Sequence, residues 1–234
     1  MSSTNQVNSR PHADRSRQGF LLEPEAVQLL GKYQIPYPEH ALAHSADEAV
    51  ELAERLGYPV VLKIVSPDVV HKSDSGGVLV ELDSSKLVRL GYDRLLAAVL
   101  SHQPDARIEG VLVCRQAPPG LEVIVGALDD PMFGPTIMFG MGGIFAELLR
   151  DVVFRIAPLR RSDAQDMIRE VKGYPLIAGL RGQKACDEEA LVSLLLAVSQ
   201  LVTENREINE LDLNPVRLYE QGLLVLDARV ITLV

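Results

Sequence analysis

Short apolar segments, several of them joined by turns, dominate the sequence from Phe20 onwards. Runs of four to eight apolar residues bounded by proline or glycine are typical of buried strands. They predict strands over 60–65, 77–82, 110–114, 121–128 and 135–139, and two strands around a turn at 220–222. Helical spacing predicts helices over 24–33, 45–57, 84–100 and 187–202, and one starting at Ser162. Since strands often follow one another without a crossover helix, the pattern favours α+β lobes over a doubly wound sheet.

Composition excludes several classes of protein. The 234 residues carry 23 basic and 32 acidic side chains, a formal charge of −9, which argues against nucleic-acid or anionic-membrane binding. Cys114 and Cys186 have no zinc-site or CxxC spacing, and no secretory leader or twenty-residue apolar span is evident, so a cytoplasmic location is expected. Residues 1–18 are polar and predict a disordered or partner-binding tail.

Two serines are candidate helix caps. Ser45 and Glu48 have the spacing of a capping box, in which the serine oxygen accepts a backbone N–H of the first turn. Ser162 and Gln165 have the same spacing. We therefore expect one helix to begin after Ser45 and another after Ser162.

Lys63 departs from the pattern of its strand. It lies in the middle of VVLKIV, where a purely structural strand would carry another aliphatic residue. A buried ammonium without a partner costs several kcal/mol, so this lysine needs an anion. The alternative is a lysine near a strand end whose head group reaches water.

Three oxygen-bearing side chains lie on the two closing strands. Asp212 and Asn214 alternate with leucines and so share one strand face, and the turn brings Asp227 onto the neighbouring strand. Such ligands can hold Mg²⁺, which commonly completes its octahedron with water and substrate phosphate oxygens. A solvated sheet face is the alternative for each of these residues taken alone.

Two glycine clusters indicate close approach of backbone to a ligand. HKSDSGGV (71–78) follows the Lys63 strand, and its backbone N–H groups can form an anion-binding concavity. FGMGGIF (139–145) precedes a predicted short helix, whose N-terminus can face phosphate. Neither cluster matches the dinucleotide fingerprint or the P-loop, so a bound nucleotide needs another architecture.

Several ordered motifs together resemble a known family. They are SADEAVELAERLGYPVVLKIVSPDVVHKSDSGGV (45–78), the stretch from PPGLEVIVGALDD to FRIAPL (118–159), VKGYPLIAGLRG (171–182) and INELDLNPV (208–216). They look like the nucleotide-binding β subunit of ADP-forming acetyl-CoA (acyl-CoA) synthetases, an ATP-grasp fold similar to the succinyl-CoA synthetase β subunit. The resemblance covers about residues 20–232. It implies two α+β lobes clamping ATP or ADP, which we place at 19–114 and 115–234.

The resemblance also implies roles for particular residues. Lys63 would contact the nucleotide phosphates, and Glu122 would approach the ribose or phosphates. The hinge strand, residues 113–117, would meet the adenine with its backbone groups. His71, beside the glycine loop, would be a phosphoryl acceptor, since neutral imidazole is nucleophilic near pH 7. The nucleotide-binding set is Lys63, Ser73, Ser75, Gly76, Gly77, Val113, Arg115, Gln116, Ala117 and Glu122. The Mg²⁺ set is Asp212, Asn214 and Asp227.

The implied reaction is acyl-CoA + ADP + phosphate ⇌ acid + ATP + CoA. The chain leaves too little length for a CoA-binding half, so we expect CoA to be bound by a partner α subunit in an α2β2 assembly. The family passes the phosphoryl group of an acyl phosphate through phosphohistidine to ADP. An alternative is a non-catalytic nucleotide-binding module of an acyl-CoA synthetase-like or protein acyltransferase assembly. A third is a carboxylate ligase that works without a partner.

Overall fold

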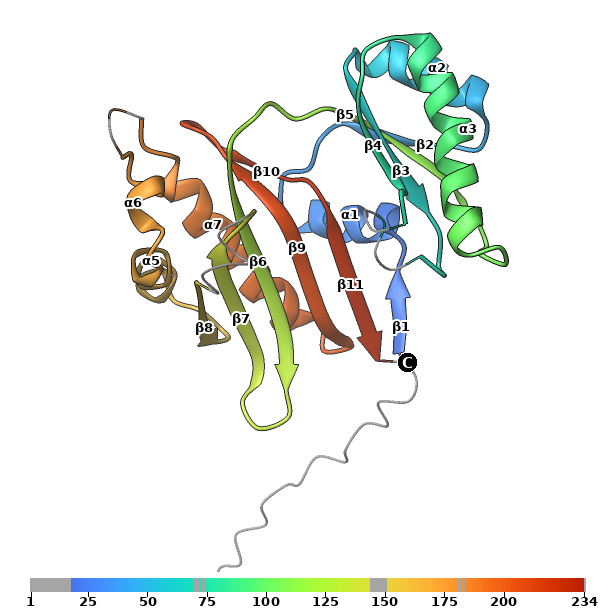
Figure 1. Cartoon of the computed structure of the whole chain (residues 1–234). Coiled ribbons are helices and arrows are strands. Elements are labelled where there is room, and N and C mark those ends of the chain that lie inside the picture. Colours follow the sequence, from blue (N-terminus) through green and yellow to red (C-terminus); the bar gives the residue numbers. More distant parts are fainter. Residues whose placement is uncertain are drawn as a thin grey trace, which may run out of the picture.

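Two antiparallel sheets make up the framework of the chain. The computed structural model describes residues 18–69, 72, 75–143, 151–180, 182 and 184–233. In this part of the chain one sheet has seven strands and the other has four, and they lie side by side (Figure 1). After the last strand of the small sheet, residues 116–120 lead the chain to the large sheet.

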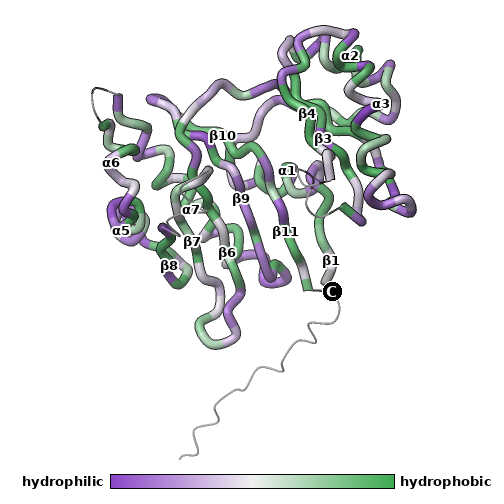
Figure 2. The backbone as a smooth tube through the Cα atoms, in the orientation of Figure 1, coloured by the Kyte–Doolittle hydropathy of each residue, from purple (hydrophilic) through white to green (hydrophobic). Residues whose placement is uncertain are grey.

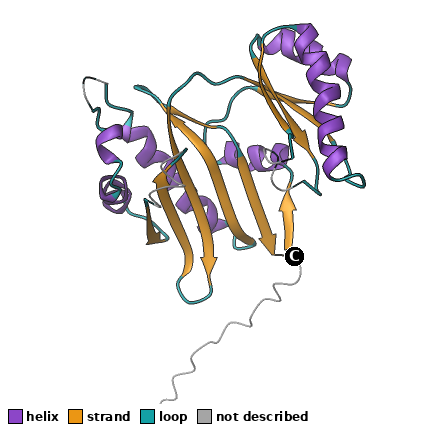
Figure 3. Ribbon diagram, in the orientation of Figure 1, coloured by secondary structure: helices purple, strands orange, loops and turns teal. Residues whose placement is uncertain are grey.

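The large sheet is formed mostly from the second half of the chain. Its strands follow the order β1 (Gln18–Leu21), β11 (Ala228–Leu233), β9 (Ile208–Leu218), β6 (Leu121–Asp130), β7 (Gly134–Met141) and β8 (Val152–Ile156). A short strand, β10 (Leu223–Val225), also pairs with β9. Helices α1 (Glu23–Lys32), α5 (Arg161–Glu170), α6 (Tyr174–Ile177) and α7 (Glu188–Glu204) belong to this lobe. Figure 3 shows α1 and α7 behind the sheet, and the buried residues of α7 share one core with β6, β7 and β9.

The small sheet has the order β2 (His40–Ala43), β5 (Gly110–Arg115), β3 (Val60–Val65) and β4 (Val78–Leu82). Helices α2 (Ala46–Leu56) and α3 (Ser85–His102) pack on it. Their buried residues form a second core with β3 and β5. Figure 2 shows the contrast between the hydrophobic strands β3 and β4 and the hydrophilic helix α5.

The start of the chain does not belong to the small lobe. We expected residues 19–114 to form the N-terminal lobe, but β1 pairs with β11 and α1 contacts that same strand. Ala26 and Leu30 of α1 are fully buried in the core of the large sheet. Residues 18–35 therefore pack with the second lobe, because the apolar face of α1 is buried in the core of the large sheet.

The predicted elements agree with the structure at most positions, with two differences at the ends of elements. The α5 helix begins at Arg161, and the N–H of Arg160 donates to Asp163 Oδ2 (2.8 Å), so the expected cap at Ser162 and Gln165 is wrong. The predicted last strand is broken, because residues 226–227 separate β10 from β11. Of the predicted tail 1–18, Gln18 belongs to β1 and residues 1–17 lie outside the described residues, as does the short helix predicted after the second glycine cluster.

Ser45 caps α2 as predicted, and its replacement should be measurable. Its Oγ accepts the N–H of Glu48 (3.1 Å). Ser45→Ala should lower the free energy of unfolding by about 1 kcal/mol, because one N–H of the first turn loses its acceptor. Urea denaturation followed by circular dichroism measures this.

Ser84 provides a matched control for that measurement. It is the N-cap of α3 but makes no side-chain cap hydrogen bond. Ser84→Ala should therefore change the stability by much less than Ser45→Ala. Equal losses in the two variants would contradict the role of the Ser45 hydroxyl.

Candidate functional site

Lys63 is buried, and its anion is a carboxylate from α1. The residue is 7% exposed in the middle of β3. Its Nζ donates to Glu23 Oε1 (2.6 Å) and to the hydroxyl of Tyr37 (2.8 Å). It also donates to the backbone carbonyl of Leu226. The prediction that this lysine needs an anion is confirmed, and in this structure the anion is a protein side chain from the other lobe.

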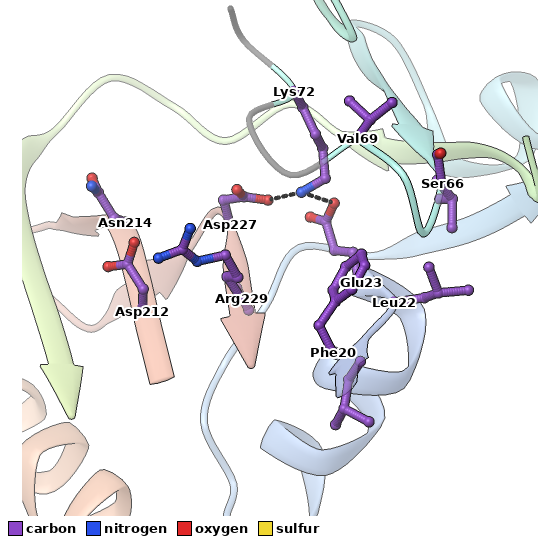
Figure 4. A pocket seen from close by; sticks show the side chains of 13 residues that line it. Phe20, Leu22, Glu23, Ser66, Val69, Lys72, Asp212, Asn214, Asp227 and Arg229 are labelled. Carbon is purple, nitrogen blue, oxygen red and sulfur yellow. Dashed lines mark hydrogen bonds and ion pairs between the residues drawn. The ribbon is translucent and has the colours of Figure 1, made fainter. Parts of the chain in front are cut away.

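A second lysine joins the same group of charges. Lys72 Nζ lies 2.8 Å from Asp227 Oδ1 and 2.9 Å from Glu23 Oε2. Lys63 Nζ lies 3.4 Å from the same oxygen of Asp227. Figure 4 shows the Lys72 ammonium between the Asp227 and Glu23 carboxylates. Two lysines and two carboxylates, which we call the interlobe ion cluster, therefore connect the small sheet to α1 and the β10–β11 connection.

Lys63 and Glu23 stabilise each other's charge, whereas the charge of Asp227 is disfavoured. Burial alone would raise the pKa of Glu23, but Lys63 and Lys72 outweigh it and lower the pKa well below its ordinary value. Burial alone would lower the pKa of Lys63, but the nearby Glu23 outweighs it and holds this pKa well above its usual range. Burial and the nearby Glu23 raise the pKa of Asp227. At neutral pH the Lys63–Glu23 pair is therefore fully ionised.

Two cavities meet at this cluster. The polar cavity, of about 280 Å³, is lined by Glu23, Ser66, Lys72, Asp212 and Arg229, among others. The second cavity, of about 370 Å³, is lined by apolar residues of β3 and β4, by Lys63 and by residues 114–117. Asn214 and Asp227 line both cavities. A ligand with an apolar ring and a charged tail could therefore place the ring in one cavity and the tail in the other.

The three candidate metal ligands line the polar cavity together. Asp212 and Asn214 project from β9, and Asp227 lies in the break between β10 and β11 (Figure 4). No group of three or more His, Cys, Asp or Glu side chains suited to a metal occurs among the described residues. The set here is two carboxylates and an amide, hard oxygen donors that suit Mg²⁺ when substrate phosphate supplies further ligands. The residues therefore fit the metal, although Asp227 is paired with Lys72 in this structure.

The predicted hinge residues divide into two groups. Arg115, Gln116 and Ala117 line the second cavity, as does Cys114, whose thiol pKa burial raises to about 12. Val113 does not: it is fully buried in the core of the small lobe, and β5 pairs at this residue with β2 and β3. Its backbone groups are paired within the sheet and it lines neither cavity, so the adenine contact predicted for Val113 has no support in this geometry.

The glycine loop packs against β3. Ile64 N–H donates to the carbonyl of Gly77 (2.8 Å), and Gly77 N–H donates to the carbonyl of Lys72 (2.6 Å). A Cβ on Gly77 would lie 2.6 Å from Ile64 Cγ2, so only glycine fits there. Ser75, Gly76 and Gly77 line neither of the two cavities, and Ser75 Oγ donates to the Lys72 carbonyl (3.0 Å). Ser75 and Gly77 thus fix the backbone carbonyl of Lys72, whereas His71 and Ser73 lie outside the described residues.

Glu122 is linked to the second cavity through an arginine. Its Oε1 accepts from Nε of Arg217 (3.0 Å), a residue of β9 that lines the second cavity. Arg217 also donates to the carbonyl of Ala117 (3.2 Å), within the connection between the sheets. Glu122 itself does not line either cavity. The contact predicted between Glu122 and a nucleotide stays a prediction, and in this structure the Glu122 carboxylate pairs with Arg217.

Sequence reasoning missed Glu23, Tyr37, Lys72 and Arg229. Glu23 stands just before Pro24 and reads as an ordinary acidic residue in a first helical turn. Lys72 could have been suspected weakly as a phosphate-binding residue, because it is the one lysine in the glycine loop. Tyr37 and Arg229 have no local signal, since their partners are far away in the sequence.

Comparison with known proteins agrees with this geometry. A model of the ATP-grasp domain family matches residues 12–232. The β subunit of acetate–CoA ligase [ADP-forming] I from Pyrococcus furiosus is 46% identical over 211 residues, which cover 90% of this chain and 91% of that protein. The chain belongs to the ATP-grasp family, among the β subunits of ADP-forming acetate–CoA ligases. The resemblance stated from the motifs and the predicted fold are both confirmed.

Solved structures of a relative carry nucleotide analogues. The dinucleotide-forming acetyl-coenzyme A synthetase 1 of Ca. Korarchaeum cryptofilum, in complex with coenzyme A, Ca-AMPCP and HgCl+, matches with a TM-score of 0.89 and 51% identity. The match covers 92% of this chain and 93% of that chain. A second structure of that enzyme, with coenzyme A and Mg-AMPPCP, has its phosphohistidine segment pointing towards the nucleotide binding site. It matches with a TM-score of 0.79 and 47% identity over 91% of this chain and 92% of that chain.

Within the described part of the chain, no helix is both long enough and apolar enough to cross a membrane.

Proposed function

We propose that this chain is the nucleotide-binding β subunit of an ADP-forming acyl-CoA synthetase. It binds Mg-ADP or Mg-ATP between its lobes and transfers a phosphoryl group between phosphohistidine and the nucleotide. The net reaction of the complete enzyme is acyl-CoA + ADP + phosphate ⇌ acid + ATP + CoA. The family membership of the chain supports this activity.

The observation that carries the proposal is the meeting of the two cavities at Asn214 and Asp227. The second cavity offers apolar walls and residues 114–117 to an adenine ring. The polar cavity offers Lys72 and oxygen ligands to the phosphates and their metal. Lys63 lies at the border, because it lines the adenine side and contacts Asp227, which lines both.

The residues divide the chemistry among them. Asp212, Asn214 and Asp227 would hold Mg²⁺, which neutralises phosphate charge when it is bound. Lys63 and Lys72 supply fixed positive charge, and phosphoryl transfer depends mainly on such positioning and charge. In the direction of ATP synthesis, the N–P bond of phosphohistidine breaks as a terminal oxygen of ADP bonds to phosphorus. The electron pair of the N–P bond stays on the ring nitrogen, and the imidazole leaves as a neutral group because its other ring nitrogen carries a proton.

The phosphoryl group must come from outside this chain. Two relatives from Pyrococcus furiosus are named β subunits, and the synthetase of Ca. Korarchaeum cryptofilum has a phosphohistidine segment that points towards its nucleotide binding site. We propose that a CoA-binding α subunit brings such a segment to the polar cavity, in an α2β2 assembly. His71 would receive the phosphoryl group before ADP does.

Two measurements test this function. Titration calorimetry of the isolated chain should show Mg-ADP binding at a single site. With a CoA-binding α subunit, acetyl-CoA, ADP and phosphate, the chain should form ATP, detected with luciferase. Neither subunit alone should do so.

Other outcomes would replace the proposal. Nucleotide binding without ATP synthesis, with any α subunit that itself makes acyl phosphate, would favour a non-catalytic module. Full synthesis by the chain alone would favour an independent carboxylate ligase. Absence of ADP binding would overturn the nucleotide site itself.

A further inference from the structure

Glu23 is the most enclosed member of the interlobe ion cluster. Its side chain is 1% exposed, and its two carboxylate oxygens each lie beside a different lysine. Oε1 lies 2.6 Å from Lys63 Nζ, and Oε2 lies 2.9 Å from Lys72 Nζ. Glu23 is also the first residue of α1, where the helix dipole stabilises negative charge. It is therefore a fixed anion that an incoming ligand would not easily displace.

The other carboxylate of the cluster has two competing uses. Asp227 lies within 2.8 Å of Lys72 and 3.4 Å of Lys63, and it is also a candidate Mg²⁺ ligand. Its side chain is 37% exposed, so a metal in the polar cavity can reach it. Without Glu23, Asp227 would be the remaining carboxylate of the cluster for both lysines. Two ammonium groups on one carboxylate would then repel a divalent cation from it.

With Glu23 present, the charges balance. Two lysines face two carboxylates, and Lys63 and Lys72 each keep an anionic partner if Asp227 turns to the metal. We propose that Glu23 is a positioning residue that balances Lys63 and Lys72 and so keeps Asp227 available to Mg²⁺. This inference rests on the proposed Mg-nucleotide site. It gives a role to Glu23, which is not one of the predicted Mg²⁺ ligands.

The test measures how much Mg²⁺ strengthens ADP binding. Calorimetry gives the dissociation constant of ADP in excess Mg²⁺ and in EDTA, and the ratio of the two is the metal effect. Glu23→Gln should reduce this ratio at least about tenfold, because the lysines then hold Asp227. Binding of metal-free ADP should be as tight as in wild type or tighter, since the cluster gains one positive charge.

Two further variants separate charge balance from a purely structural role. Glu25→Gln makes the same change of charge in the same helical turn, at an exposed position whose Oε2 accepts the Leu22 N–H (2.8 Å), and should leave the ratio unchanged. The double variant Glu23→Gln with Lys72→Met removes one lysine as well and should recover much of the metal effect. It also buries less unpaired charge, so it tests the proposal if Glu23→Gln alone does not fold.

The outcomes separate this inference from the proposed function. Absence of ADP binding by wild type would overturn the nucleotide site. If wild type shows a metal effect and folded Glu23→Gln shows the same one, the charge-balance role is wrong. Equal weakening of ADP with and without Mg²⁺, or a double variant with a smaller metal effect than Glu23→Gln, would also overturn it.

Discussion

Replacing Lys63 with methionine should lower the rate of ATP synthesis at least about 100-fold, the size expected when a charged donor to a transferring phosphoryl group is lost. Methionine keeps the length of the side chain but removes its charge. Of the four contacts of Lys63 Nζ, the one to Asp227 is the longest, at 3.4 Å. We therefore expect nucleotide phosphate to replace that contact in the complex. Luciferase detection of ATP, with the α subunit present, measures the rate.

The same variant should also be less stable. Removing one partner of a buried ion pair costs about 3 kcal/mol, because the remaining charge stays desolvated. Here Lys72 still faces Glu23, which limits the loss. Assays therefore need to be run well below the unfolding midpoint of Lys63→Met, as determined by circular dichroism.

A matched lysine shows whether the effect is specific. Lys86 is exposed on α3, in the same lobe, and Lys86→Met should keep full activity and stability. Adenosine, which has no phosphate, should bind Lys63→Met about as well as wild type, whereas ADP should bind more weakly. Wild-type turnover by folded Lys63→Met, or equal weakening of adenosine and ADP, would rule out the phosphate role.

Sequence reasoning located Lys63 because the signal is local. A cation interrupts an apolar run of six residues, and the predicted bounds of that strand are those of β3. Asp212 and Asn214 were found in the same way, from alternation along one strand. Patterns of period two are visible in a single short segment, so these predictions needed no knowledge of the rest of the chain.

The remaining parts of the site depend on distant pairings. Glu23 and Lys63 are 40 positions apart, and Lys63 and Leu226 are 163 apart. The strand β1 has four residues, too few for a periodic signal, and it is recognised only by its pairing with β11 at the other end of the chain. These contacts explain why the lobe boundary and the partner of Lys63 could not be predicted from local patterns.

Val113 shows a different limit of prediction from sequence. The apolar run at 110–114 was correctly assigned to a strand, but a strand's length does not show where its backbone leaves the sheet. Val113 is paired on both sides, and β5 ends at Arg115. Backbone groups can reach a ligand only where pairing ends, and here the N–H groups of Arg115 and Gln116 still donate to the carbonyls of Glu39 and Pro59.

His71→Ala should abolish ATP formation while the partner subunit continues to form acyl phosphate. Our hypothesis is that this imidazole accepts the phosphoryl group before ADP does, and alanine has no nucleophilic nitrogen. His71 directly precedes Lys72, whose ammonium lines the polar cavity, so the chain passes close to the proposed transfer site. Acyl phosphate trapped with hydroxylamine and ATP measured with luciferase report the two steps separately.

His102→Ala, which changes an exposed residue at the end of α3, is the control and should keep both steps. Full turnover by His71→Ala would mean that the partner's phosphohistidine reaches ADP directly, and the site would then need only its lysines, its metal ligands and Glu23.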